Sequence, residues 1–578
     1  MVGACRLSQT KLQSMTASSL VTPLPDPDIA GPFAAEPQRG GQDFQGAAGF
    51  EQAIVANQHP LATVENGSAD GASAGNIAEM HSKLGNACMI QDDLEGAEAN
   101  YKAALRLAPQ LTSCWCNLGT VHLKTGRAQD AIALYVHALT LNPAHWPSRT
   151  NLVQALVTTK QHLLAKALLM ELANERPQDM AIRRQLGKLH FELNELESAL
   201  ECFQHAVALN PDDSESIYWI GGIRQQMGET EAAETAYAEA ARLQPLIRKP
   251  AAKLQADFRV LALFAPFAGN LPTEYLFKDA VYDTDTLALL ASSQYDAESL
   301  KQDVQVVVNL ISDADHADAL LPLAADLVDR LGRPIVNDPR KIQMTTRDVV
   351  AGRLQGIPNC LVPKVWRQKT GAAFSMPTVR AALPPSASVL VRPVGTHGGD
   401  EFEKIEDPAE LAALLAQPAE TDRYLIEYID YRSSDGHFRK YRFIFVDDQI
   451  LPYHLAIANH WKVHHGNADM ADHRWMQREE EAFLNDPASV FHAGHYEALR
   501  AIQQRIGLEY FGIDCGLDRA GNLVVFEVNA SMLVHDDNVE FPYKAPFVHR
   551  IKQAFDEMLR KIARFAAAAA PSNLARST

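Results

Sequence analysis

The sequence FGIDCGLDRAGNLVVFEVNA, residues 511–530, decides the fold of the C-terminal part of this chain. It contains two apolar runs, Phe511–Leu517 and Leu523–Val528, on either side of a turn with a glycine. Two short apolar runs joined by such a turn are typical of a β-hairpin. We therefore expect two antiparallel strands here.

Three polar residues interrupt this hairpin. Side chains alternate along a strand, so Glu527 and Asn529 share one face, and Asp514 can face them from the partner strand. A carboxylate in an apolar run needs a partner, because its desolvation is costly. Clustered carboxylate and amide oxygens suit Mg²⁺, which completes its shell with phosphate oxygens. The pattern predicts a magnesium site, and the alternative is a solvated hairpin face that carries acids.

Length, charge and cysteine usage narrow the class of protein. A chain of 578 residues predicts three or four domains, and a net charge of −18 disfavours nucleic acid and anionic membranes as partners. Neither an apolar run of transmembrane length nor a secretory signal is recognisable. The seven cysteines have no Cys-x-x-Cys spacing, which indicates free thiols. We therefore expect a cytoplasmic protein.

A repeat with a period of 34 residues occupies the first half of the chain. Its recurring positions are prolines at 109, 143, 177, 211 and 245, alanines at 97, 131, 165, 199 and 233, glycines at 85, 119, 187 and 221, and aromatic residues at 101, 135, 203 and 237. Each unit predicts two amphipathic helices, of which the second ends before the proline. The pattern resembles the tetratricopeptide repeat over 77–246, in five units. The third unit is degenerate, with Val153 and Leu169 in the glycine and aromatic registers.

A solenoid of this kind exposes a concave groove, so we expect it to bind a peptide or protein segment. The alternative is that the array serves only as a spacer or a dimerisation surface. The flanking residues 1–75 and 566–578 lack periodicity and are predicted to be a disordered linker and a tail.

The rest of the chain predicts two further domains. Strand-like runs at Phe258–Phe267 and Val304–Ile311, with a helical stretch near 315–332, indicate a small α/β unit over 255–340. From 341 to 565 strands, loops and helices alternate, as in an α+β nucleotide-binding domain. The expected fold class is therefore an all-α solenoid followed by an α/β unit and an α+β domain.

A strand at Ser388–Pro393 ends in a cation and is followed by a glycine-rich stretch. Arg392 can pair with phosphate oxygens, and Gly395, Gly398 and Gly399 free the backbone to close over a ligand. No Gly-Lys-Ser/Thr follows, so this is not a Walker loop. The pattern predicts a phosphate-binding loop, with an ordinary hairpin turn as the alternative.

The strand Arg423–Ile429 is apolar except for Glu427. A strand that leads into a linker can offer backbone donors and acceptors to the edge of an adenine ring between apolar walls. The alternative is a plain core strand with one solvent-facing acid.

The order of these features resembles the ATP-grasp superfamily over about 255–560. It is similar to carboxylate–amine ligases such as the ribosomal-protein glutamate ligases, in which a pre-ATP-grasp α/β domain precedes the ATP-grasp domain. The resemblance implies ATP as cofactor and two Mg²⁺ ions on Asp514, Glu527 and Asn529. It also implies an adenine hinge at Glu427 to Ile429, including Tyr428.

By the same resemblance, arginines replace the usual phosphate-binding lysines. Arg392 matches one of them and Arg347 approximately matches the earlier one, and both replacements keep the positive charge. Lys440 or Arg442 is expected to line the phosphate channel, with Arg392 and Arg442 stabilising the transferred group.

The segment His454–Trp475 is rich in histidine. We expect a loop over the active site that contributes Lys462 or a histidine, and a zinc site is the alternative. The acids at Glu479–Glu481 are typical of a solvated helix face.

Two departures argue against the D-alanine–D-alanine ligases specifically. Gly512 stands where those enzymes have a catalytic arginine, and Ala530–His535 replaces their Ser-Pro-Gly. The segment Asp430–Phe438 looks like an insertion, which leaves the ribose-binding acid unassigned.

The resemblance implies a ligase that forms an acyl phosphate and then an amide or thioester. The array would present a peptide or protein partner, and a small molecule or amino acid would be the co-substrate. Two alternatives stay open, namely a kinase of the same superfamily and an adaptor protein whose ATP-grasp domain only senses nucleotide.

Overall fold

The computed structural model of the protein describes residues 71–267, 269–372, 383, 387–396, 402–463, 470–536, 538 and 540–569. Gly398 and Gly399 of the expected phosphate loop lie outside these ranges. The chain forms two compact units, which meet in the sequence at Ala236 and Tyr237. Among the described helices, none is both long and apolar enough to cross a membrane.

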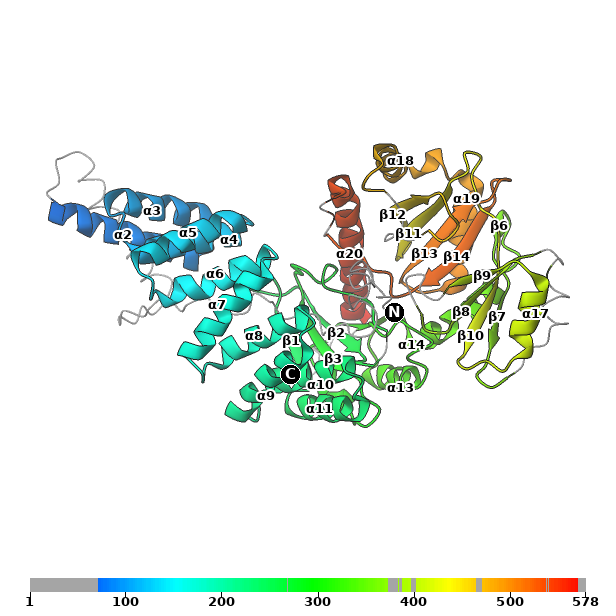
Figure 1. Ribbon diagram of the computed structural model, residues 1–578, viewed down its shortest axis with the longest axis horizontal. Coiled ribbons are helices and arrows are strands. Elements are labelled where there is room, and N and C mark those ends of the chain that lie inside the picture. The colour runs from blue at the N-terminus through cyan, green and yellow to red at the C-terminus, as the bar shows by residue number, and fades with distance from the viewer. Residues whose placement is uncertain are drawn as a thin grey trace, which may run out of the picture. The chain divides into compact units, whose positions relative to one another are not determined.

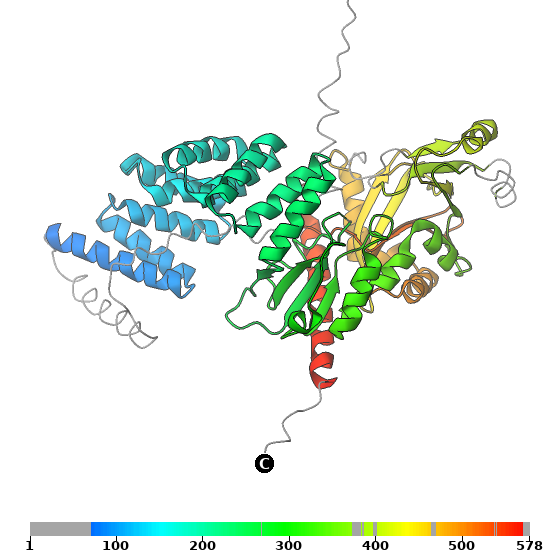
Figure 2. The same cartoon turned by 90° about the horizontal axis from the view of Figure 1, so that it is seen from below.

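The first unit is built from consecutive antiparallel helices (Figures 1 and 2). They are α2 (Gly71–Ile90), α3 (Leu94–Leu107), α4 (Thr112–Lys124), α5 (Ala128–Leu141), α6 (Trp146–Thr158), α7 (His162–Glu175), α8 (Met180–Glu192), α9 (Leu196–Leu209), α10 (Ser214–Gln226) and α11 (Thr230–Leu243), the last of which crosses the unit boundary. In every repeat the second helix ends two residues before the register proline, as the sequence predicts.

Glycine and aromatic residues of the same repeat pack against each other. A Cβ atom on Gly119 would lie only 2.7 Å from Cε1 of Tyr135, and the first and fourth repeats show the same close approach. In the third repeat Val153 replaces the glycine and Leu169 replaces the aromatic residue, and both are buried in one apolar cluster. The exchange of a small and a large side chain explains why this repeat departs from the register.

The described residues of the second unit form three sheets. The mixed sheet has the order β1-β3-β2-β4-β5 and consists of β1 (Leu246–Lys249), β2 (Arg259–Phe264), β3 (Asp283–Ala288), β4 (Val306–Asn309) and β5 (Ile335–Val336). All neighbouring pairs are parallel except β1 with β3. The helices α12 (Ala297–Leu300) and α13 (Leu321–Leu331) connect its strands. The strands β2 and β4 and the helix α13 fall within the runs predicted from the sequence.

The central sheet has the order β12-β11-β13-β14-β6. Its strands are β6 (Cys360–Leu361), β11 (Phe438–Val446), β12 (Gln449–Ala458), β13 (Tyr510–Leu517) and β14 (Leu523–Asn529). Helices α14 (Pro339–Ile342) and α15 (Arg347–Leu354) precede it, α18 (Arg474–Asn485) and α19 (Ala493–Ile506) lie between β12 and β13, and α20 (Ala545–Ala569) follows. The β13–β14 pair is the hairpin predicted from residues 511–530, and Asp514 lies directly opposite Glu527.

The small sheet is antiparallel and has the order β7-β10-β8-β9. It consists of β7 (Val365–Gln368), β8 (Val389–Pro393), β9 (Glu403–Ile405) and β10 (Arg423–Glu427), and α17 (Pro408–Ala416) covers one face (Figure 1).

The three sheets do not share one core. Leu261 of the mixed sheet and Phe443 of the central sheet belong to a single large apolar cluster. The small sheet instead packs Val389 and Leu425 against Leu411 of α17 in a cluster of its own. A second cluster of the small sheet, with Leu390, Tyr424 and Ile426, has Trp461 packed against it. The small sheet therefore lies outside the large cluster that joins the mixed and central sheets.

Candidate functional site

A cavity of about 220 Å³ lies between the small sheet and the central sheet. It is lined by Pro363, Leu390, Phe402, Ile426, Tyr428, Ile429, Tyr431, Trp461, Val463 and Phe526, and by Arg347, Arg392, Glu427, Lys440, Arg442, Lys462, Asp514, Glu527 and Asn529. The lining includes every predicted site residue that the structure describes except Gly395. Residues from 347 to 529 in the sequence thus meet around one space.

Asp514 contributes a buried carboxylate to the lining of the cavity. Arg442 donates from Nε and Nη2 to its two oxygens, at 2.6 and 3.0 Å, and Lys440 Nζ lies 3.1 Å from Oδ2. Burial alone would raise the pKa of Asp514, but the charges of Arg442 and Lys440 outweigh it and hold this pKa well below its usual range. Asp514 is therefore ionised at neutral pH.

Glu527 and Asn529 extend this polar row along β14. Arg347 Nη2 donates to Glu527 Oε1 at 2.6 Å, and the backbone N–H of Ser531 donates to Asn529 Oδ1 at 2.7 Å. The cross-strand register places Arg442, Asp514 and Glu527 side by side on β11, β13 and β14. Cys515 points away into the core, as the alternation predicts.

Two carboxylates and one amide oxygen are a ligand set that suits Mg²⁺ when phosphate oxygens complete the shell. Among the described residues there is no cluster of three or more His, Cys, Asp and Glu side chains placed to hold a metal. Asp514, Glu527 and Asn529 are hard oxygen donors, and they would need further oxygens from a ligand to complete the shell of Mg²⁺.

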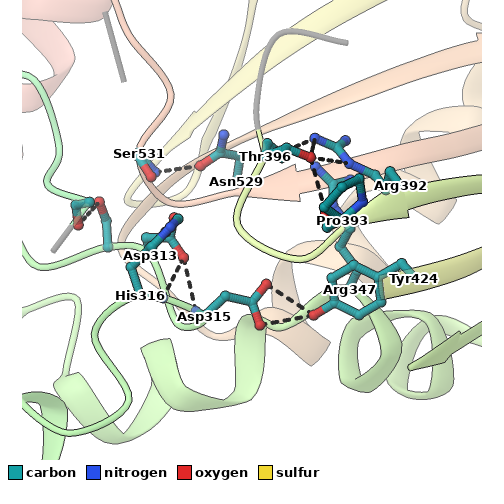
Figure 3. Close-up of polar contacts among 12 residues, drawn as sticks. Asp313, Asp315, His316, Arg347, Arg392, Pro393, Thr396, Tyr424, Asn529 and Ser531 are labelled. Carbon is teal, nitrogen blue, oxygen red and sulfur yellow. Dashed lines mark hydrogen bonds and ion pairs between the residues drawn. The ribbon is translucent and has the colours of Figure 1, made fainter. Parts of the chain in front are cut away.

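Arg392 approaches the cavity from the end of β8 and is almost fully buried. Its guanidinium donates to the carbonyl oxygen and, at 3.0 Å, to the hydroxyl of Thr396 (Figure 3). Burial, followed by the nearby charge of Arg347, lowers the pKa of Arg392 to about 10. Gly395 does not line the cavity; its φ of +79° allows the turn, and its Cα faces His316.

The strand β10 ends where the adenine hinge was expected. The backbone N–H groups of Glu427 and Tyr428 donate to the carbonyl oxygens of Lys364 and Ser388, at 2.9 and 3.1 Å. The Glu427 carboxylate in turn accepts from the backbone N–H of Lys364 at 3.0 Å. Ile429 lies two residues beyond the end of the strand and lines the cavity.

Aromatic side chains form the walls at this end. Trp461 packs edge to face against Phe402 and Tyr428, with ring centroids 5.6 and 6.1 Å apart. Tyr431 packs on Phe526 and donates its hydroxyl to the Trp461 carbonyl at 2.7 Å. These walls suit a flat, apolar ring. Sequence reasoning missed Phe402, Tyr431 and Phe526, which come from separate loops and strands.

The histidine-rich segment is not one loop. Lys462 lines the cavity as expected, but His454 belongs to β12 and contacts Glu480 of α18. Glu480 is fully buried rather than solvated, and it also accepts from Tyr543 at 2.6 Å and lies 3.4 Å from Lys544 Nζ. The expectation of a solvated helix face was therefore wrong for Glu480, because the helix turns this residue towards β12.

Comparison with known proteins identifies the first unit. Residues 76–144, 122–189, 181–213 and 214–245 each match the tetratricopeptide repeat family. Residues 76–245 are therefore tetratricopeptide repeats, which confirms the prediction from the 34-residue period. Repeats of this family imply protein or peptide partners.

Two curated relatives are similar to part of the chain. The cell division cycle protein 27 homolog of Caenorhabditis elegans is 29% identical over 169 residues, which cover 29% of this chain and 21% of that protein. The human protein O-mannosyl-transferase TMTC1 is 26% identical over 220 residues, which cover 31% of this chain and 24% of that protein. The chain thus spans less than a quarter of the length of either relative.

Two solved structures are similar over a comparable part. MamA from residue 41 to its end, from Desulfovibrio magneticus RS-1, is 21% identical, with 29% of this chain and 94% of that chain covered and a TM-score of 0.28. YrrB, described as a TPR protein with an unusual peptide-binding site, is 22% identical, with 34% and 92% covered and a TM-score of 0.27.

Proposed function

We propose that this protein is an ATP- and Mg²⁺-dependent ligase of the ATP-grasp type, which joins a carboxylate to an amine or, less often, a thiol. In this proposal the tetratricopeptide array holds a peptide or protein that carries one substrate. The observation that carries the proposal is the division of one cavity into an aromatic end and an end where Asp514, Glu527 and Asn529 lie among cations.

The aromatic end suits an adenine ring. Ile429, which lies beyond the end of β10 and lines the cavity, would offer its backbone groups to the edge of the ring. The N–H groups of Glu427 and Tyr428 are already used within the small sheet. Trp461 and Phe402 would enclose the ring.

The polar end suits a polyphosphate. Five cationic side chains of the lining face three carboxylates, so the cavity carries an excess of positive charge that a polyanion would neutralise. Arg347 comes from α15, Arg392 from β8 of the small sheet, and Lys440 and Arg442 from β11 of the central sheet. Mg²⁺ on Asp514, Glu527 and Asn529, when bound, supplies charge neutralisation between the phosphates.

The proposed reaction has two steps. A substrate carboxylate oxygen attacks the γ-phosphorus of ATP, the bond to the β–γ bridging oxygen breaks, and ADP leaves. Arg392 and Arg442 offset the charge on the transferred group. An amine then attacks the acyl carbon, phosphate departs with the electrons of the broken C–O bond, and the amine loses a proton, which leaves an amide.

Hydroxylamine trapping tests this reaction directly. The full chain is incubated with Mg·ATP, hydroxylamine and candidate carboxylate substrates captured on the array by crosslinking. A hydroxamate together with ADP is the expected result, because only an acyl phosphate reacts in this way. Formation of ADP with a phosphorylated product and no hydroxamate would favour a kinase instead.

A second candidate is an adaptor whose C-terminal unit only senses nucleotide. It is favoured by the ion pairs of Asp514 with Arg442 and of Glu527 with Arg347, which already neutralise both carboxylates. Tight nucleotide binding, with ADP release at background for every captured partner, would support the adaptor.

A further inference from the structure

The two walls of the cavity are anchored differently. The central sheet shares the large core with the mixed sheet, whereas the small sheet has its own. Polar contacts that cross from the small sheet to the rest of the unit therefore matter for its position. One carboxylate, Asp315, makes two of them.

Asp315 lies in the loop that follows β4 of the mixed sheet. Its carboxylate accepts from the hydroxyl of Tyr424, at 2.9 and 3.0 Å, and from Arg367 Nη1 at 2.9 Å (Figure 3 shows the Tyr424 contact). Tyr424 lies on β10 and Arg367 on β7, so the Asp315 carboxylate bonds to two strands of the small sheet. Burial raises the pKa of Asp315, and Tyr424 and Arg367 counteract it.

The two residues that bond to Asp315 are cross-strand neighbours in the same row of the sheet as Arg392. In the register of the small sheet Tyr424 lies opposite Arg367 on one side and opposite Arg392 on the other. These cross-strand neighbours lie on the same face of the sheet. Asp315 therefore holds the strand next to the arginine that the proposed function assigns to phosphate.

A second contact from the same loop reaches the turn after β8. Asp313 Oδ2 lies 2.8 Å from His316 Nδ1, and the His316 ring sits so close to Gly395 that a Cβ there would be 2.6 Å from Cε1. Thr396, the next residue, accepts from the Arg392 guanidinium. The loop thus contacts the small sheet on β7 and β10 and at the turn that follows β8.

We propose that Asp315 is a positioning residue that locks the small sheet against the mixed sheet and so sets Arg392 over the phosphate end of the cavity. The inference rests on the proposed function for its consequence, since Arg392 needs a phosphate to act on. The lock itself is a property of the protein without ligand.

Hydrogen exchange of the full chain without nucleotide tests the lock. Asp315→Ala is expected to speed exchange in β7 and β10 while the central sheet is unchanged, and Asp315→Asn, which keeps an acceptor for Tyr424, is expected to have a smaller effect. Asp422→Asn is the matched control, because Asp422 accepts from Arg367 Nε at 3.1 Å but lies within the small sheet. Unchanged exchange in Asp315→Ala, or equal effects of Asp315→Ala and Asp422→Asn, would overturn the proposal.

Binding of a non-hydrolysable ATP analogue with Mg²⁺ tests the consequence. Loss of a charge-assisted contact predicts roughly a tenfold weaker affinity for Asp315→Ala. In an Arg392→Ala background the same substitution is expected to have little further effect, whereas a merely structural role would add to it. Additive losses would refute the positioning role. A wild-type protein that binds no analogue would refute the proposed function instead, and the exchange experiment would still decide the lock.

Discussion

The repeat array and the C-terminal unit are stabilised on different scales of sequence separation. In the array a recurring contact joins a glycine and an aromatic residue of the same repeat, as between Gly119 and Tyr135, and neighbouring repeats share an apolar cluster. In the C-terminal unit they join distant residues, as between Arg442 and Asp514 or between Arg347 and Glu527. A substitution in one repeat can therefore be compensated by a second substitution in the same repeat. A substitution at the cavity instead leaves a charged residue from a distant part of the chain without its partner.

The largest expected effect is at Glu527, because the proposed function gives it a chemical role. Glu527→Ala is expected to lower Mg²⁺-dependent ADP formation by roughly a hundredfold or more. The variant lacks a carboxylate ligand of the proposed Mg²⁺ site, and a weakly held Mg²⁺ neutralises less of the charge on the phosphates. Steady-state turnover with a captured partner and circular dichroism measure activity and fold. The control is Glu481→Ala, an exposed carboxylate. Retained turnover would remove Glu527 from the site.

Loss of the cation next to Asp514 is expected to act on stability. Arg442→Met leaves a carboxylate that is only 3% exposed without its bidentate partner, and the cost is about 3 kcal/mol after Lys440 offsets part of it. Urea unfolding measures the difference, with Arg478→Met on the exposed side of α18 as the control. The double variant Arg442→Met/Asp514→Asn should recover stability, and additive losses would contradict the long-range pairing.

Acid stability tests the buried cluster of Glu480. Burial would raise the pKa of Glu480, but His454 and Lys544 reverse this and lower it to about 2, below its ordinary value near 4.5. The stabilisation from Glu480 is therefore complete above about pH 4.5 and is lost as the pH falls towards 2. Glu480→Gln should flatten the pH dependence of urea unfolding in this window, whereas Glu481→Gln should not. If Glu480→Gln leaves the pH dependence of the unfolding free energy unchanged, the Glu480 cluster is not the source of that dependence.

The smallest effect concerns the array and exploits its third repeat. Gly119→Val is expected to destabilise the protein by about 1–3 kcal/mol, because the new side chain overlaps the Tyr135 ring. Adding Tyr135→Leu reproduces the pair Val153 and Leu169 and should restore much of the loss. Thermal unfolding of the two single variants and the double variant measures the coupling. Failure of the double variant to recover would show that repeats are not compensated locally.

Particular residues show what was predictable. The prolines marked the helix ends, and the alternation in residues 511–530 put Glu527 and Asn529 on one face that Asp514 could share, because both patterns depend on local geometry. The exact register, with Asp514 opposite Glu527, came from the structure. Arg392, Arg442 and Lys462 were expected near the cavity from order and charge, and they line it. Glu480 was misjudged, since a run of three acids does not reveal which one a helix turns inward.

The repeat array and the alternation of the hairpin follow from local sequence patterns. The contacts of Asp315 with Tyr424 and Arg367, the pairing of Arg442 with Asp514 and the separate cluster of the small sheet depend on how the chain packs. The physical reason is that periodicity fixes which face of an element is buried, whereas ion pairs between residues far apart in the chain depend on how whole sheets pack.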